Sequence, residues 1–301
     1  VIDTTTVFDT QNGELTFYGK YKVRDSRKGG YGKIPISEIF ERSSNTGMVQ
    51  AIYNEYNSKP EQFVNRLMNM GLSEPLGLPI VGEAKPVIPH PDKKGWSGIS
   101  LPWMAYGYGV LMTPMQTLTF YNAIANDGVM VRPRFIENTQ NTRSQIKKQS
   151  EVEIINPSIC SKETIGKVKS MLKGVVEKPW GTAHNIYDPN FAISGKTGTC
   201  QLDYNTEEVQ YVASFVGYFP SDQPKYSCIV VIHRPDKEKG YFGNQVAAPV
   251  FQTIAHKLYS SIPRETKLSR DRYLKITGNK NGTNQSLVEA DFKLAKTQKK
   301  S

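Results

Sequence analysis

Residues 191–234 read FAISGKTGTCQLDYNTEEVQYVASFVGYFPSDQPKYSCIVVIHR, and this stretch decides the fold class. It contains three short segments rich in β-branched and aromatic residues, at 191–199, 209–218 and 226–234, separated by turn-forming Asp, Asn, Pro and Ser. Because the connections between these segments are short, they predict an antiparallel meander of three strands. We therefore expect an antiparallel sheet in the C-terminal half of the chain.

Helical patterns flank this stretch on both sides. The segment 36–56 is helical in pattern but contains Ser43-Ser44-Asn45-Thr46-Gly47, and because Ser and Asn favour helix caps, two helices joined at this point are predicted. Apolar periodicity and capping residues predict further helices at 60–70, 113–126, 161–177 and 246–259. Loops with short extended pieces are predicted at 1–33, a long, ordered surface segment at 72–102, and a loop or small hairpin at 138–153. The predicted fold class is α/β (α+β), an antiparallel sheet flanked by helices.

Charge is unevenly distributed along the 301 residues. The formal net charge is +10, yet residues 264–301 contain ten Lys and Arg against four Asp and Glu. A weakly basic body with a basic tail is a poor electrostatic footprint for nucleic acid, so no nucleic-acid partner is expected. We divide the chain into a domain at 1–262 and a basic polar tail at 263–301. The tail is interpreted as a solvated linker, with attraction to anionic lipid or polymer as the alternative.

Cysteine and histidine spacing gives no sign of a metal site. Cys160, Cys200 and Cys228 do not have the spacing of metal ligands, and the four His lie far apart, so neither a metal nor a cofactor is expected. Three cysteines also give no disulfide framework. Cys200 is interpreted as a small, partly buried strand residue, although its place directly after Thr199 leaves open that it modulates a site there.

The sharpest local motif is Ser194-Gly195-Lys196-Thr197-Gly198-Thr199. It is not a phosphate-binding loop, because that motif needs a Gly five positions before Gly195, and position 190 is Asn. On a strand edge, Lys196 supplies a positive charge, Thr197 and Thr199 supply hydroxyl groups, and Gly198 permits a close approach to the backbone. These features predict binding of an extended peptide that ends in a carboxylate.

A second motif, Ser43-Ser44-Asn45, lies at the predicted helix junction, where side chains can point into a cleft. A serine at such a place can relay a proton, and an amide can both donate to and accept from a substrate peptide bond. Taken alone, the motif is equally explained as a helix cap. Its position about 150 residues before the first motif makes a functional role more specific than a helix cap.

Ser-x-Asn followed about 150 residues later by Lys-Thr-Gly forms two of the three motifs of serine penicillin-recognising enzymes. The chain resembles class B penicillin-binding proteins, the division and elongation transpeptidases, over about residues 1–262. Further segments carry the resemblance in the family's order: Gly107-Tyr108-Gly109, Thr113-Pro114-Met115-Gln116, Asn126-Asp127-Gly128, Arg132-Pro133, Gly181-Thr182-Ala183 and Phe215–Pro220.

The resemblance implies the fold of penicillin-binding proteins and β-lactamases, with an all-helical subdomain beside the sheet. It implies a D,D-transpeptidase that acts on the D-Ala-D-Ala end of peptidoglycan stem peptides and is a target of β-lactams. Ser43 would relay a proton, Asn45 would hold the substrate amide, and Lys196 would provide the positive field. Residues 197–199 would bind the substrate carboxylate. Other cell-wall synthesis proteins are expected as partners, at the extracytoplasmic face of the bacterial inner membrane.

The chain departs from the family in one respect. The family's Ser-x-x-Lys, which carries the acylated serine, should precede Ser43, and no such tetrad does so. The tetrads Ser144–Lys147 and Ser170–Lys173 lie between the other motifs and are interpreted as coincidences. With no signal peptide at the N-terminus, we expect an N-terminally incomplete domain whose missing portion supplies nucleophile and anchor, so that the chain alone is inert toward β-lactams. The alternatives are a β-lactamase, a β-lactam-sensing domain, or a non-catalytic binding module of the same fold.

Overall fold

The computed structural model describes residues 2–136, 138–140, 147–149, 151–202 and 209–261. The chain divides into two compact units, Val1–His256 and Lys257–Ser301. The predicted tail at 263–301 lies outside the described residues, so its boundary at 262 stays a prediction. No described helix is long and apolar enough to cross a membrane.

A three-stranded antiparallel sheet forms the centre of the first unit, as predicted. Its strands are β9 (Ser194–Leu202), β10 (Gln210–Phe219) and β11 (Tyr226–His233), in the order β11-β10-β9. The strand β9 begins at Ser194, three residues later than predicted, because its last pair with β10 joins Ser194 to Tyr218. Among the described strands β9 is therefore an edge of this sheet, with one side of its backbone turned away from β10.

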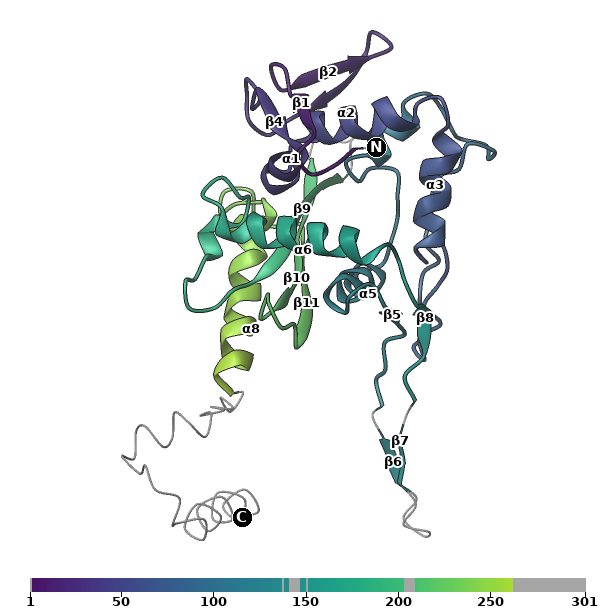
Figure 1. Cartoon of the computed structure of the whole chain (residues 1–301), viewed down its shortest axis with the longest axis vertical. Helices are drawn as coiled ribbons and strands as arrows, with labels where there is room; N and C mark the ends of the chain where they lie inside the picture. The colour runs from purple at the N-terminus through teal and green to yellow at the C-terminus, as the bar shows by residue number, and fades with distance from the viewer. Residues whose placement is uncertain (1, 137, 141–146, 150, 203–208, 262–301) are drawn as a thin grey trace, which may run out of the picture. The chain divides into compact units, whose positions relative to one another are not determined.

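Helices cover both faces of this sheet. Alternate residues of β10 point to opposite faces, and Phe215 and Phe219 pack edge-on against Phe251 of α8 (Ala248–Ser261). On the other face, Tyr218 lies in a buried cluster with apolar side chains of α5 (Pro114–Ala125) and α6 (Lys162–Glu177). Figure 1 shows α6 crossing the sheet beside β9. The core thus holds β9 between neighbours that fix its position.

The helices that precede the sheet follow the predicted pattern. They are α1 (Ile36–Arg42), α2 (Asn45–Tyr56) and α3 (Pro60–Asn69), with Pro60 at the start of α3 and Gly71 in a left-handed conformation after its end. Thr113 and Gln116 form a capping box at the start of α5. The helix α4 (Ser100–Met104) was not predicted, because five residues are too few to show a helical period.

Short strand pairs complete the first unit. The pairs are β1 (Val7–Asp9) with β4 (Lys33–Pro35), β2 (Glu14–Phe17) with β3 (Tyr21–Arg24), β5 (Met130–Val131) with β8 (Ile154–Asn156), and β6 (Asn138–Gln140) with β7 (Lys147–Gln149). The predicted hairpin at 138–153 corresponds to β6 and β7. The helix predicted at 246–259 is preceded by a separate short helix, α7 (Gly243–Val246), and a 3-10 turn, η1, spans His184–Ile186.

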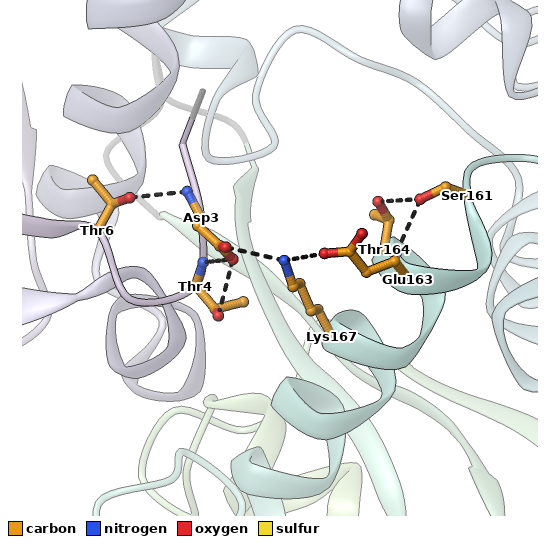
Figure 2. A network of polar contacts seen from close by, with 7 residues as sticks. All are labelled: Asp3, Thr4, Thr6, Ser161, Glu163, Thr164 and Lys167. Carbon is orange, nitrogen blue, oxygen red and sulfur yellow. Dashed lines mark hydrogen bonds and ion pairs between the residues drawn. The ribbon is translucent and has the colours of Figure 1, made fainter.

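An ion-pair network ties the N-terminal segment to α6 (Figure 2). The Nζ atom of Lys167 lies 3.0 Å from a carboxylate oxygen of Asp3 and 2.7 Å from one of Glu163. Hydrogen bonding to Lys167 holds the pKa of Asp3 below its ordinary value, and hydrogen bonds to Glu163 and to Asp3 raise the pKa of Lys167. The network is exposed, so it orients the first residues rather than adding much stability.

Candidate active site

The junction of α1 and α2 exposes Ser43. This residue has a left-handed backbone, with φ 55° and ψ 44°, and the N–H of Ser44 donates to the carbonyl of Ile39, as in a Schellman motif. Such a conformation costs a non-glycine residue about 1–3 kcal/mol, so the surroundings must hold it in place. Ser44 is buried and caps α2, because its Oγ accepts the N–H of Gly47 at 3.1 Å. The tight turn leaves the Ser43 side chain pointing outward.

Gly47 allows the two helices to meet closely at this junction. A Cβ atom at position 47 would lie 2.7 Å from the side chain of Ile39, which is fully buried at the end of α1. Real Cβ contacts do not approach that closely, so only glycine fits without a shift of one helix. The close packing sets the direction in which α1 and α2 leave the Ser43 turn.

The side chains of Ser43 and Lys196 meet, although 153 positions separate them. Lys196 lies on the edge strand β9, and its Nζ donates to Ser43 Oγ at 2.8 Å. The same Nζ lies 5.6 Å from the ring centroid of Phe40 on α1. Burial lowers the pKa of Lys196 to about 8, so at neutral pH the ammonium form predominates. In this contact the charged Lys196 donates and the Ser43 oxygen accepts. The Ser43 hydroxyl proton is not used in the contact, so Ser43 can donate it to another group.

Asn45 follows in the first turn of α2 and is held differently. Its Nδ2 donates to the backbone carbonyl of Arg24 at 2.7 Å. This bond sets the orientation of the amide and joins α2 to the end of β3. The structure thus brings Ser43 and Lys196 into direct contact, and it places Asn45 two residues further on with its amide directed at Arg24.

The two threonines of the β9 motif are oriented by neighbouring segments. Thr197 Oγ1 lies 3.0 Å from the hydroxyl of Thr182, and Thr199 Oγ1 accepts the backbone N–H of Gly243 at 3.1 Å. That oxygen accepts a hydrogen bond, so the Thr199 hydroxyl proton is available to donate to a ligand. Gly198 lies against Ser214 of β10, where a Cβ would be 2.5 Å from the serine oxygen. The absence of a side chain at position 198 therefore lets β9 pack against Ser214, and it also leaves the backbone at this strand edge accessible.

Other residues singled out in the sequence lie outside this arrangement. The prediction that Cys200 is partly buried is wrong: its side chain is exposed, because Thr199 and Cys200 are exposed in succession and both faces of β9 are open there. Lys173 pairs with Asp222 at 3.0 Å on the surface of α6, so the tetrad that it closes belongs to an ordinary helix. Ser144 lies outside the described residues, and these hold no cluster of metal ligands.

Comparison with protein families decides the assignment. The family model described as penicillin binding protein transpeptidase domain matches residues 1–256. The chain belongs to this family. The match covers every element that builds the site, from the N-terminal strands to His256 in α8. It confirms the resemblance that the two motifs indicated. It also confirms the predicted α/β fold with an antiparallel sheet.

Individual relatives agree with the family. The chain is 29% identical over 250 residues to the penicillin-binding protein PbpB of Mycolicibacterium smegmatis, covering 79% of this chain and 37% of the relative. It is 30% identical over 229 residues to the peptidoglycan D,D-transpeptidase FtsI of Buchnera aphidicola subsp. Baizongia pistaciae, covering 75% and 37%. The crystal structure of penicillin-binding protein 3 from Mycobacterium tuberculosis, complexed with aztreonam, superimposes with a TM-score of 0.73 at 27% identity, covering 87% of this chain and 59% of that one. The chain thus spans little more than a third of the length of these curated relatives.

Proposed function

We propose that this chain is the C-terminal part of the transpeptidase domain of a peptidoglycan D,D-transpeptidase that acts through an acylated serine. The observation that carries the proposal is the 2.8 Å contact between Lys196 Nζ and Ser43 Oγ. Two short motifs far apart in the chain meet there, at the edge of a sheet where an extended peptide can bind. Relatives named peptidoglycan D,D-transpeptidase and a penicillin-binding protein crystallised with aztreonam support the same reaction class.

The proposed reaction has two steps. A serine oxygen attacks the carbonyl of the penultimate D-Ala, the C–N bond to the terminal D-Ala breaks, and the leaving amine takes up a proton. An amine of a neighbouring stem peptide then attacks the acyl-serine ester, forms the new amide and releases the serine. Ser43 passes the proton to the leaving nitrogen, since its Oγ already accepts a hydrogen bond from Lys196 and its own proton can be given up.

The substrate carboxylate would bind beside β9. The Lys196 charge attracts it, and the hydroxyls of Thr197 and Thr199 can donate to it, because Thr199 Oγ1 already accepts from Gly243. Asn45 would contact the substrate amide. The backbone N–H of Thr199 would serve as one oxyanion donor, a type of contact worth about 2.7–4 kcal/mol of transition-state stabilisation. β-Lactams carry the same carboxylate and would occupy the same groove.

The nucleophilic serine and its lysine would come from outside these 301 residues, since no Ser-x-x-Lys precedes Ser43 in the sequence. We place the whole protein at the extracytoplasmic face of the membrane, where its substrate is found. Stem peptides, β-lactams and other cell-wall synthesis proteins are its proposed partners.

Fluorescent penicillin tests the proposal. We expect the 301-residue chain alone to remain unlabelled, and the full-length protein to be labelled at a serine that these residues do not contain. Thr199→Val in the full-length protein should slow acylation about 10- to 100-fold, because the carboxylate loses a hydroxyl donor while the backbone N–H stays in place, whereas Thr199→Ser should stay near the wild-type rate. Mass spectrometry that locates the adduct on Ser43, Ser170 or another serine of this chain would contradict the proposed division of the site.

A further inference from the structure

Asp25 forms a hydrogen-bonded anchor at the start of α2. One of its carboxylate oxygens accepts the Thr46 hydroxyl at 2.8 Å and the Ser44 hydroxyl at 3.0 Å. The other accepts the backbone N–H of Thr46 at 2.9 Å. With the bond from Asn45 to the Arg24 carbonyl, three consecutive residues of the junction are attached to Arg24, the last residue of β3, and to Asp25, which follows it.

This anchor is strong because its partners are buried. The residue Thr46 is fully buried and Ser44 is only 2% exposed, so water cannot replace the carboxylate as their acceptor. The Thr10 carbonyl is a second acceptor for the Thr46 hydroxyl, at the longer distance of 3.4 Å. Leaving a buried hydroxyl unpaired is costly, and a charged acceptor is a stronger partner than a neutral one. A carboxylate at the N-terminus of the 12-residue helix α2 is also favoured by the helix dipole. The first turn of α2 therefore has one well-determined position relative to β3.

The position of Ser43 follows from the anchor. Ser43 is the single residue between the end of α1 and the Ser44 cap. It has a left-handed backbone conformation, which is unfavourable for a non-glycine residue unless its neighbours hold it in place. If Ser44 and Thr46 were released from Asp25, the junction could relax and Ser43 Oγ could leave Lys196. We propose that Asp25 is a positioning residue of the active site, which keeps the Ser43 hydroxyl on Lys196 by fixing Ser44 and Thr46.

The inference rests on the proposed function, because it assigns Asp25 to the site in which Ser43 and Lys196 act. It is nevertheless testable without any turnover. Lys196 is partly buried beside Ser43 and Phe40, and the loss of hydrating water around its ammonium group lowers its pKa to about 8. If the junction relaxes, water reaches the ammonium group and the pKa rises toward the ordinary lysine value of about 10.4. The pKa of Lys196 therefore reports the geometry of the junction.

The experiment measures this pKa in the 301-residue chain by acetic anhydride labelling of Lys196, read by mass spectrometry at pH values from about 6 to about 11. We expect Asp25→Ala to raise the pKa by about one unit or more. Asp25→Asn should raise it less, since the amide oxygen can still accept the Thr46 N–H. The control is Asp9→Asn, because Asp9 is exposed and its carboxylate accepts the backbone N–H of Gln11. This variant should leave the pKa unchanged.

The outcomes separate positioning from stability. Folded Asp25 variants that melt at a lower temperature but keep the Lys196 pKa of the wild type would reduce Asp25 to a structural residue and overturn the inference. If Asp25→Ala does not fold, Asp25→Asn and the control decide the question in the same way. A wild-type chain in which Lys196 titrates like an ordinary lysine would show that water already reaches this ammonium group, and it would overturn the inference. The proposed function is tested separately, by penicillin labelling of the full-length protein.

Discussion

The contact between Glu41 and Trp180 yields the sharpest prediction for stability. Glu41 is only 6% exposed, lies two residues before Ser43, and accepts the indole N–H of Trp180 at 2.7 Å. Its other oxygen rests against Gly174 of α6, where there is no room for a Cβ. Burial raises the pKa of the Glu41 carboxyl, and the bond from Trp180 opposes that rise. The pair thus joins the end of α1 to the segment after α6.

Replacing Trp180 by Phe removes the donor and leaves the carboxylate buried. Loss of a hydrogen bond to a charged group costs about 1.5–3 kcal/mol, which for a domain of this size lowers the melting temperature by roughly 4–10 °C. Trp103→Phe is the matched control, since both indoles are 38% exposed and Trp103 packs edge-on against Tyr21. The control should cost about 1 kcal/mol or less, and circular dichroism of thermal unfolding measures both variants.

The pH dependence of the loss tests its cause. A carboxyl whose folded pKa is raised binds its proton more tightly in the folded state, so its contribution to stability falls as pH rises from the unfolded value of about 4.3 to the folded one. Without Trp180 the folded pKa rises further, and the loss extends to higher pH. The deficit of Trp180→Phe should therefore be larger at neutral pH than at about pH 4.5. An equal deficit at both pH values, or one no larger than that of Trp103→Phe, would refute this reasoning.

Two further predictions concern the helix junction and the lysine. Gly47→Ala should destabilise the chain by about 1–3 kcal/mol through its clash with Ile39, whereas Gly166→Ala on α6, with no neighbouring atom within 4 Å, should stabilise it by about 0.5–1 kcal/mol; urea unfolding decides. Lys196, with its pKa lowered to about 8, loses its charge as pH rises through that value. Affinity of the full-length protein for a peptide ending in D-Ala-D-Ala should therefore fall about tenfold between pH 7 and pH 9, as measured by calorimetry. An affinity independent of pH would show that the Lys196 charge does not bind the carboxylate.

Much of the fold was predictable, because helices and strands depend on neighbours a few residues apart. Three short segments rich in β-branched and aromatic residues predicted the meander, and the Thr113 cap and the Ser43–Ser44 break predicted helix ends within one or two residues. The two motifs also predicted which residues belong to the candidate site, since their order and spacing are characteristic of one family. Their roles in catalysis remain proposals that the experiments above test.

The contacts that hold these residues in place are visible only in the folded chain. The bonds of Asp25 to Ser44 and Thr46, of Asn45 to the Arg24 carbonyl, and of Trp180 to Glu41 join residues 19 to 139 positions apart. Such contacts leave no periodic or spacing signal, because a backbone carbonyl or a single carboxylate looks the same in any sequence. The elements and the motifs can thus be predicted from local sequence, whereas the polar groups that orient them are set by the approach of distant segments. The physical reason is that local preferences act within a few residues, and hydrogen bonds in the core form only after packing has brought their partners together.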